Sequence, residues 1–432
     1  MAATEGHIHS AGKIPARHLM VIIGALLVEV AFSITLTGLS FFTPAVLGDF
    51  PGTRAGAFMI YFTLYGFASA ASMPVAGMLI DRIKAPGLLV LGGLIAAGGL
   101  VVFSAAQSLW WFYAAGIVIG IGVGLSLQYV PIVVINRWFV AKRGTVLGIV
   151  LAGTGVGGVI LGVVVPILLR TVGWRTSMVI MAVAMVVLTT GPALFLIRSN
   201  PEDLGLRPYG AEVAPADEVT TKTGNEPGMT QREAFGSIWF YVLAASLLLL
   251  GAIYGMTQHF VNYLSGKPWG VELRPEEIST IIITATICLI VFKPFLGWFI
   301  DKVGLERALW IVLLIAAGAT AAWAYMTTLL PYVFFVIFIF LGTASGTVAP
   351  PLIAEHSFGQ KEFSKIWGTL GMAYPIGLSI GAAVWGWVKD YFGSYGYGFV
   401  SVPVFTLLVL LGVSATFRGA RKLWVPEAQQ SA

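Results

Sequence analysis

Twelve long apolar runs constrain the fold of this chain more than any other feature of its sequence. Each is long enough to cross a bilayer, which takes about 20 residues of α-helix. Inside lipid a crossing segment must satisfy its own backbone polar groups, and an α-helix does so. The sequence therefore predicts an all-α membrane protein with twelve transmembrane helices, at about 19–46, 56–80, 87–108, 110–135, 144–169, 175–197, 238–264, 277–300, 307–328, 331–353, 363–388 and 395–417.

Composition and charge exclude several other classes of protein. Hydrophobic residues make up 57% of the chain and charged residues 10%, whereas a soluble domain is about half apolar and a quarter charged. Lys and Arg are scattered between the apolar runs without forming a basic face, so no nucleic acid partner is expected. The single cysteine, Cys288, excludes an intrachain disulfide and a thiolate metal cluster. No metal and no cofactor is predicted.

The distribution of Lys and Arg predicts the orientation in the membrane. Most of them fall in the two termini, the middle segment and the alternate loops on the same side, as in the stretch from Arg137 to Arg143. Cytoplasmic loops carry the excess of basic residues in membrane proteins. We therefore expect a multi-pass protein of the cell membrane with both termini in the cytoplasm.

One polar segment divides the chain near its middle. It runs over residues 199–235 and is rich in Pro, Glu, Thr and Gly, which is typical of a linker. The predicted organisation is a cytoplasmic tail, a six-helix bundle, a cytoplasmic linker, a second six-helix bundle and a second tail, at 1–17, 18–198, 199–235, 236–418 and 419–432.

An internal repeat supports two equivalent halves. The stretch Gly77-Met-Leu-Ile-Asp81-Arg82 returns in the second half of the chain as Gly297-Trp-Phe-Ile-Asp301-Lys302. Duplicated six-helix halves are a transporter architecture, with the substrate bound at the midplane between them. The repeat therefore predicts two pseudo-symmetric bundles.

These loop motifs resemble those of the major facilitator superfamily, and the resemblance covers essentially the whole chain. It implies that Asp81, Arg82, Asp301 and Lys302 lock the cytoplasmic helix ends in one state of an alternating-access cycle. The first copy continues as Lys84-Ala85-Pro86-Gly87, which departs from the usual Gly-Arg pattern.

A narrower resemblance is to the oxalate:formate antiporter and monocarboxylate porter group. It rests on Asn136-Arg137-Trp138-Phe139-x-x-Lys142-Arg143-Gly144 and on Lys293-Pro294 in the eighth run. By this resemblance Arg137 and Arg143 belong to the lock, and Lys293 replaces an Arg that binds substrate carboxylate. Tyr374 replaces a second cationic residue of the oxalate transporter, which favours a monocarboxylate. Leu289 stands where animal monocarboxylate transporters have an Asp.

Lys293 is the strongest substrate-binding candidate on physical grounds as well. It lies about 12 Å along the helix axis from Asp301, at 1.5 Å per residue. A charge this deep in a span costs about 2.5 to 3.5 kcal/mol, so it needs a partner or a water-filled cavity. One interpretation is an anchor for a substrate carboxylate. The others are a structural ion pair and a lysine that snorkels to the interface.

Two residues are candidates for proton coupling. Glu29 is the only acidic residue deep in the first run, and it either carries a proton or simply neutralises Lys293. His259 lies toward the outer end of the seventh run and titrates near physiological pH. The alternative for His259 is an ordinary hydrogen-bonding role.

Gln128, Tyr129 and Tyr374 are polar groups among apolar neighbours. A pocket for a small organic anion needs a few placed donors in an apolar lining, and these three are candidates for that role. Contacts between helices are the alternative explanation for each of them.

The sequence thus predicts a secondary active transporter of a small monocarboxylate, working by proton symport or anion exchange. Its expected partners are the carboxylate, protons and the bilayer, and a functional monomer is the family expectation. A drug or cation exporter of the same superfamily is the first alternative, although Lys293 would repel a cation. A non-transporting receptor or an enzyme is the second, although no set of catalytic residues is present.

Overall fold

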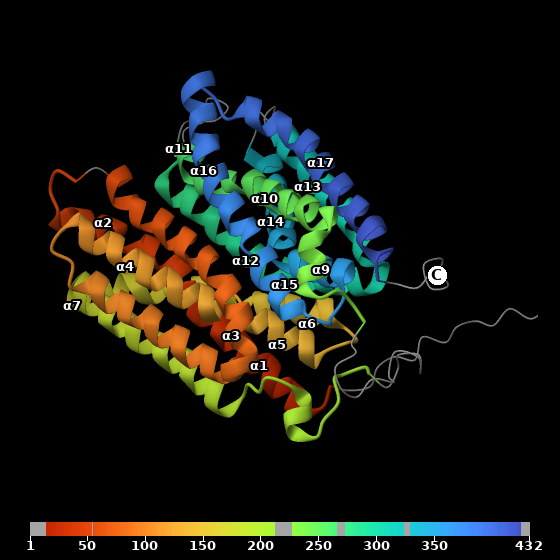
Figure 1. The fold of residues 1–432 in the computed structure, drawn as a ribbon. Coiled ribbons are helices and arrows are strands. Elements are labelled where there is room, and N and C mark those ends of the chain that lie inside the picture. Colours follow the sequence, from red (N-terminus) through yellow and green to blue (C-terminus); the bar gives the residue numbers. More distant parts are fainter. Residues whose placement is uncertain (1–13, 54, 212–226, 266–272, 324–328, 425–432) are drawn as a thin grey trace, which may run out of the picture.

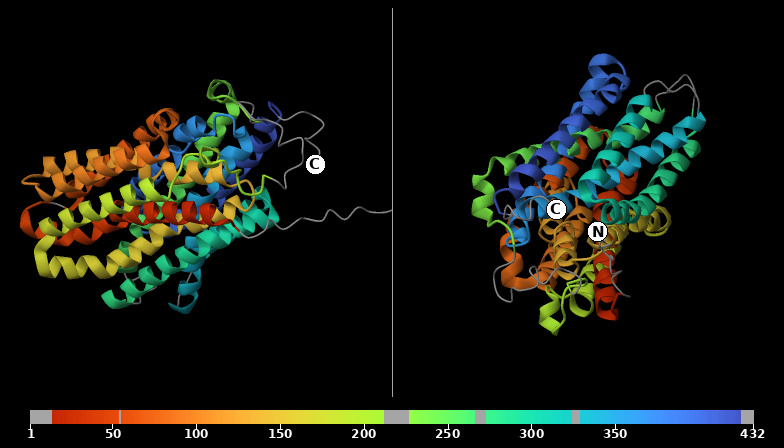
Figure 2. Two further views of the ribbon diagram at one scale, coloured as in Figure 1. Left: turned by 90° about the horizontal axis from the view of Figure 1, so that it is seen from below. Right: turned by 90° about the vertical axis from the view of Figure 1, so that its right-hand side faces the viewer.

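The computed structural model describes residues 14–53, 55–211, 227–265, 273–323 and 329–424. Within these ranges the regular elements are helices, with two isolated bridges between loops. They form two groups of helices, one from each half of the chain (Figure 1). The helices run roughly along one common direction, as the further views in Figure 2 show.

The first bundle contains the first six spans. Its elements are α1 (Ala16–Ser33), a π-helical turn (Ile34–Gly38), α2 (Leu39–Asp49), α3 (Ala55–Ser104), α4 (Leu109–Gly122), a second π-helical turn (Val123–Leu127), α5 (Val130–Trp138), α6 (Arg143–Leu151) and α7 (Gly153–Phe195).

The second bundle contains the other six spans. Its elements are α9 (Gln231–Gly236), α10 (Ile238–Tyr254), a 3-10 turn (Gly255–His259), α11 (Phe260–Ser265), α12 (Pro275–Val303), α13 (Leu305–Trp323), α14 (Leu329–Phe358), α15 (Phe363–Leu370), α16 (Ala373–Phe392) and α17 (Gly396–Arg421).

Two long helices each contain two consecutive spans. The backbone of α3 turns at Lys84 (φ 60°), and that of α7 turns at Gly173 (φ 75°). Pro86 stands in the first turn after Lys84, where a proline is tolerated because that N–H has no helical partner. Each of these turns divides one long helix into two spans, so the helices follow the order of the twelve predicted runs. The predicted all-α fold with two six-helix bundles is confirmed.

The outer surface suits a lipid environment. Eight helical stretches among the described residues are long and apolar enough to cross a membrane. Large apolar side chains are widely exposed, including Trp110, Phe195 and Tyr391 at 77%, 73% and 90%. An exposed apolar surface of this extent indicates contact with lipid.

One end of the molecule, called here the linker end, carries the start of α1, the end of α17 and the described parts of the linker. There Tyr209 pairs with the loop before α6, donating its N–H to Trp138 O and accepting from Val140 N, at 2.9 Å each. Gly228 pairs with Gly359 in the loop before α15. The two ends of the linker therefore bind equivalent loops of the two bundles. Parts of the predicted tails and linker, residues 1–13, 212–226 and 425–432, lie outside the described residues.

Candidate functional site

Lys293 lies on α12, between the two bundles. Its side chain is 4% exposed, and its Nζ donates hydrogen bonds of 2.8 Å to Leu151 O and to Thr154 Oγ1. Both acceptors belong to the first bundle, at the break between α6 and α7. Because an ammonium group has three donors, these two neutral acceptors leave one N–H of Lys293 without a partner among the described residues.

The break at Ala152 exposes the carbonyl that Lys293 uses. Residues 143–151 and 153–195 are divided at Ala152, whose carbonyl takes the Gly155 N–H. The Leu151 carbonyl therefore accepts from side chains, from Thr154 Oγ1 at 2.9 Å and from Lys293 Nζ. The last carbonyls of a helix have no intrahelical donor and carry partial negative charge. A buried ammonium is stabilised by such a helix end even though no carboxylate touches it. Discontinuous helices near the middle of a bundle are typical of transporter binding sites.

Glu29 brings the only other charge close to Lys293 within the part of the chain that the structure describes. Its side chain is 1% exposed on α1, and it attracts Lys293 electrostatically without a direct ion pair. The ideal Cβ of Gly153 would lie 2.9 Å from the Glu29 Cβ, so Glu29 sits against the same helix break. The two charges and the break between α6 and α7 form one site, called here the central site.

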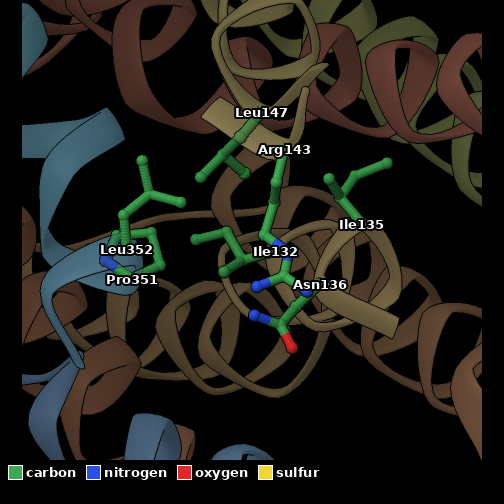
Figure 3. A pocket seen from close by; sticks show the side chains of 7 residues that line it. All are labelled: Ile132, Ile135, Asn136, Arg143, Leu147, Pro351 and Leu352. Carbon is green, nitrogen blue, oxygen red and sulfur yellow. The ribbon is translucent and has the colours of Figure 1, made fainter. Parts of the chain in front are cut away.

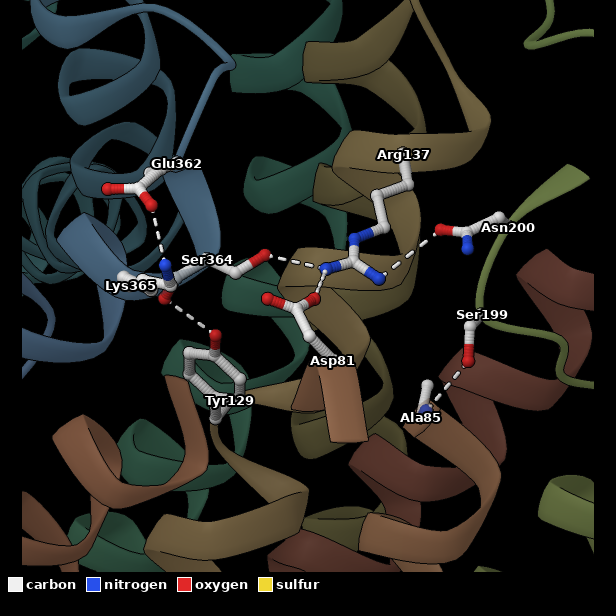
Figure 4. Close-up of polar contacts among 9 residues, drawn as sticks. All are labelled: Asp81, Ala85, Tyr129, Arg137, Ser199, Asn200, Glu362, Ser364 and Lys365. Carbon is white, nitrogen blue, oxygen red and sulfur yellow. Dashed lines mark hydrogen bonds and ion pairs between the residues drawn. The ribbon is translucent and has the colours of Figure 1, made fainter. Parts of the chain in front are cut away.

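The contacts that the described structure gives to the remaining substrate-site candidates are with residues other than Lys293 and Glu29. Gln128 accepts a 2.8 Å hydrogen bond from Ser69 Oγ within the first bundle. Tyr129 is fully buried and donates to Ser364 O at 2.6 Å, so it joins the two bundles (Figure 4). Tyr374, near the start of α16, packs its phenol against Gly346 of α14. For Tyr129 the structure favours the helix-contact interpretation.

His259 lies away from the central site, at the end of the molecule opposite the linker. Its Nε2 is 2.6 Å from Ala382 O, and its Nδ1 is 3.1 Å from the Tyr395 hydroxyl. Nε2 must carry a proton to bond a carbonyl oxygen, so Nδ1 accepts from Tyr395 in the neutral ring. Both ring nitrogens are therefore occupied by contacts within the second bundle.

Asp301 forms the first part of a polar latch at the linker end. Its carboxylate accepts from the backbone N–H groups of Gly144 and Thr145, at 2.9 and 2.7 Å, and from Thr145 Oγ1 at 2.6 Å. These N–H groups belong to the first turn of α6, where a carboxylate is favoured by the helix dipole. An acid from the second bundle thus caps a helix of the first.

Arg143 and Glu355 form the second part of this latch. They make an ion pair between α6 and α14, with side chains only 11% and 15% exposed. Asn136 Nδ2 donates to the same carboxylate at 3.0 Å. Figure 3 shows Arg143 and Asn136 at one side of a small pocket between the bundles, with Leu147 and Leu352 among its apolar lining. Because Arg143, Leu147 and Leu151 share one face of α6, this pocket separates the ion pair from Lys293.

Arg137 and Asp81 form the third part. Arg137 donates to Asp81 Oδ1 and to Ser364 Oγ, both at 2.8 Å, and reaches Asn200 at 3.2 Å (Figure 4). The guanidinium therefore ties α3, α5, α15 and the first part of the linker together.

The structure brings four of the six predicted lock residues into this latch. Asp81, Arg137, Arg143 and Asp301 take part, whereas Arg82 is exposed and bonds no other described residue. Lys302 lies over the Trp298 ring, 4.9 Å from its centroid, on its own helix. Sequence reasoning missed Thr145, Thr154, Ser364 and the role of Glu355. The sequence shows that Asp301 belongs to a repeated motif, but it does not show that this aspartate binds backbone N–H groups of α6.

A carboxylate at the linker end has a shifted pKa. Hydrogen bonds from Lys365 and from the Gln231 backbone lower the pKa of Glu362 below its ordinary value. Glu362 directly precedes α15 and accepts from the backbone N–H of Gln231, the first residue of α9, at 2.6 Å. It therefore holds the end of the linker against the second bundle.

Comparison with known proteins shows the family of the chain. The sequence profile described as "Major Facilitator Superfamily" matches residues 21–354 and 270–431, which is most of the chain. The chain belongs to the major facilitator superfamily. It is a transporter and not an enzyme, as the sequence predicts.

Among its relatives, Monocarboxylate transporter 12-B of Danio rerio is 24% identical over 397 residues, covering 87% of this chain and 82% of the relative. Monocarboxylate transporter 11 of Mus musculus is 25% identical over 364 residues, covering 78% and 73%. The predicted resemblance to the monocarboxylate porter group is confirmed.

Solved structures show the same fold. The proton:xylose symporter XylE superposes with a TM-score of 0.71 at 14% identity, over 96% of this chain and 97% of that one. The human organic anion transporter MFSD10 gives 0.66 at 13%, over 93% and 100%. At these identities the likeness extends to the fold alone.

Proposed function

We propose that this chain is a secondary active transporter of a small monocarboxylate, bound at Lys293 between the two bundles. The observation that carries the proposal is a deeply buried ammonium whose direct partners are two neutral oxygens. The names of the relatives, monocarboxylate transporters 11 and 12, support the substrate class.

An incoming carboxylate would compensate the charge of Lys293 more fully than the present contacts do. The present bonds of Lys293 already have a charged donor, and a carboxylate would make the acceptor charged as well, which adds the attraction between opposite charges. In a buried site their effect is greater still, because water does not screen the charges. The third N–H of Lys293 is the donor available for the first such bond. An anion of one charge matches the single lysine.

Glu29 is the proposed site of proton coupling. While the site is empty its carboxylate is the counter-charge of Lys293, and a bound substrate anion would take over that role. Two carboxylates facing one ammonium leave an excess negative charge, which a proton on Glu29 removes. Proton symport follows if Glu29 takes up that proton; anion exchange follows if it stays ionised throughout. His259, whose two nitrogens are occupied far from this site, is the weaker candidate.

We further propose that the linker end faces the cytoplasm, so that the latch closes the central site on that side. The positions of Lys and Arg along the chain support this orientation. A functional monomer in the cell membrane, with domain boundaries at 18–198 and 236–418, completes the proposal.

Reconstituted vesicles test the function directly. Purified protein is assayed with labelled lactate, acetate, formate and oxalate, with and without a pH gradient. We expect saturable uptake of at least one monocarboxylate, lost in Lys293→Ala and partly kept in Lys293→Arg, with equal amounts of protein in the vesicles. Normal uptake by Lys293→Ala, or transport of cations only, would overturn the proposal.

The coupling is tested by Glu29→Gln in the same vesicles. If Glu29 carries the proton, this variant exchanges anions but no longer accumulates substrate when a pH gradient is imposed. Unchanged accumulation by Glu29→Gln excludes that role for Glu29 while leaving the role of Lys293 intact.

A further inference from the structure

The internal repeat assigns Lys293 a counterpart in the first bundle. Met73-Pro74 precedes Gly77 and Asp81 on α3 with the same spacing by which Lys293-Pro294 precedes Gly297 and Asp301 on α12. Met73 is 1% exposed. The position that carries a buried charge in one half therefore carries a buried thioether in the other.

The packing around Met73 and Lys293 is equivalent. A Cβ on Gly148 of α6 would lie 2.3 Å from Lys293 O, and a Cβ on Gly368 of α15 would lie 2.9 Å from Met73 O. These two glycines are themselves counterparts in the repeat. The repeated helices thus cross their partners in the opposite bundle at matching points, α12 on α6 and α3 on α15.

Both side chains extend across the bundle interface to matching helix breaks. Lys293 Nζ binds Leu151 O, where α6 ends. The Met73 Cε lies 2.6 Å from the ideal Cβ of Gly371, directly after α15 ends. Leu151 and Gly371 are counterparts in the repeat. Met73 therefore occupies, on its side of the molecule, the place that Lys293 occupies on the other.

The polar residue that follows each helix break also differs between the two halves of the chain. Thr154, which accepts from Lys293, has Tyr374 as its counterpart in the repeat. The Tyr374 phenol lies against Gly346, where an ideal Cβ would be 2.3 Å from its hydroxyl oxygen. A methionine and a tyrosine thus replace the ammonium and the small hydroxyl, so these two positions carry no charge; the polar groups beside them are the Tyr374 hydroxyl and the buried Trp367 indole N–H.

We propose that Met73 is a specificity-determining residue that receives the uncharged end of the substrate, opposite the carboxylate held by Lys293. This inference rests on the proposed function and adds the orientation of the substrate to it. A second carboxylate at Met73 would be desolvated without a cation to pair with, which is costly. Dicarboxylates are then disfavoured because Met73 does not compensate their second negative charge. Substrates with apolar tails are favoured because the flexible thioether of Met73 packs against the tail.

The test compares substrates in vesicles that contain Met73→Lys. We expect the ratio of labelled oxalate uptake to labelled monocarboxylate uptake to rise at least about tenfold, since pairing one more buried charge is worth more than about 1.4 kcal/mol. The matched control is Met78→Lys, the same substitution at a 56% exposed position of the same helix. Its ratio should stay at the wild-type value.

A second variant keeps the inference testable if the new lysine prevents folding. Met73→Ala shortens the side chain without adding charge, and we expect it to favour monocarboxylates with longer apolar tails over formate. Unchanged selectivity in folded Met73→Lys, or in Met73→Ala where the lysine variant fails, would overturn the role of Met73. The proposed function would fail separately, if the wild-type protein moved no monocarboxylate.

Discussion

The two helix crossings that close the linker end are built on the same repeat but use different chemistry. Where α12 crosses α6, a Cβ on Gly297 would lie 1.9 Å from Gly144 O, so the backbones are in contact. Where α3 crosses α15, the matching distance from Gly77 to Ser364 O is 2.9 Å. Asp301 then caps α6 through two backbone N–H groups, whereas Asp81 binds the Arg137 side chain.

The residues at the start of α6 and of α15 also differ. Lys142 precedes α6, whereas Glu362 precedes α15, directly after Lys361 and with its carboxylate paired to Lys365. A positive side chain favours the approach of Asp301 to the first turn of α6. At the start of α15 the Glu362 carboxylate binds Lys365 and the Gln231 N–H, and Asp81 pairs with Arg137 of its own bundle. A duplicated motif thus keeps its geometry while its partners change.

The largest effect is expected from the ion pair between Arg143 and Glu355, beside the crossing of α12 and α6. Among the described residues, the crossing of α3 and α15 has no ion pair that is equally buried. In Arg143→Ala the carboxylate of Glu355 loses its cation, and breaking one partner of a buried pair costs about 3 to 5 kcal/mol. The closed linker end should therefore open. A cysteine at Leu352, in a Cys288→Ser background, should react with maleimide at least about a hundredfold faster than in the parent.

Arg137→Ala is the comparison for that experiment. Its pair with Asp81, which is 51% exposed, lies within the first bundle, and such pairs contribute about 0 to 1 kcal/mol. Among the described residues, its one bond to the second bundle is to the neutral Ser364 Oγ, so labelling should rise only a few fold. Equal effects of the two arginine variants would contradict the asymmetry between the crossings.

The next effect is expected at the two aspartates. Asp301→Asn keeps the shape of the cap but removes its charge and replaces one acceptor oxygen by NH2. Hydrogen bonds to a charged group contribute about 1.5 to 3 kcal/mol, so we expect a roughly tenfold to hundredfold shift toward the open linker end. The same cysteine assay measures it.

Asp81→Asn is the matched substitution at the other crossing. Only one side-chain pair is weakened there, and a change below about fivefold is expected. A stronger effect at Asp81 than at Asp301 would show that the first crossing carries the latch.

The sequence predicted the fold because hydrophobic length and the repeat are properties of single segments. Lys293 stood out for the same reason, since one charge within an apolar run is visible without any partner. Its partners were not predictable, because Leu151 offers a backbone carbonyl exposed only by the helix break. Met73 is an apolar residue in an apolar run, so the sequence alone does not mark it as a site residue. The structure shows that it occupies the place equivalent to that of Lys293.

The smallest effect concerns Glu362, and it depends on pH. Hydrogen bonds from Lys365 and the Gln231 backbone lower its pKa in the folded protein. The stability it contributes is therefore present above the ordinary carboxyl pKa and is lost as the pH falls through the lowered folded value. Because the side chain is 27% exposed, the contribution is at most about 1 kcal/mol. Glu362→Gln should lower the melting temperature slightly at pH 7.

Lowering the pH should remove that difference between Glu362→Gln and the parent. Protonation converts the parent carboxylate into a neutral group much like the amide, so the two melting curves should converge as the pH falls through the lowered folded pKa of Glu362. Lys365→Gln serves as the control, because it removes one source of the lowered pKa and should move the convergence to higher pH. A difference that widens as the pH falls would mean that Glu362 is held in its protonated form, which is the opposite of the lowered pKa.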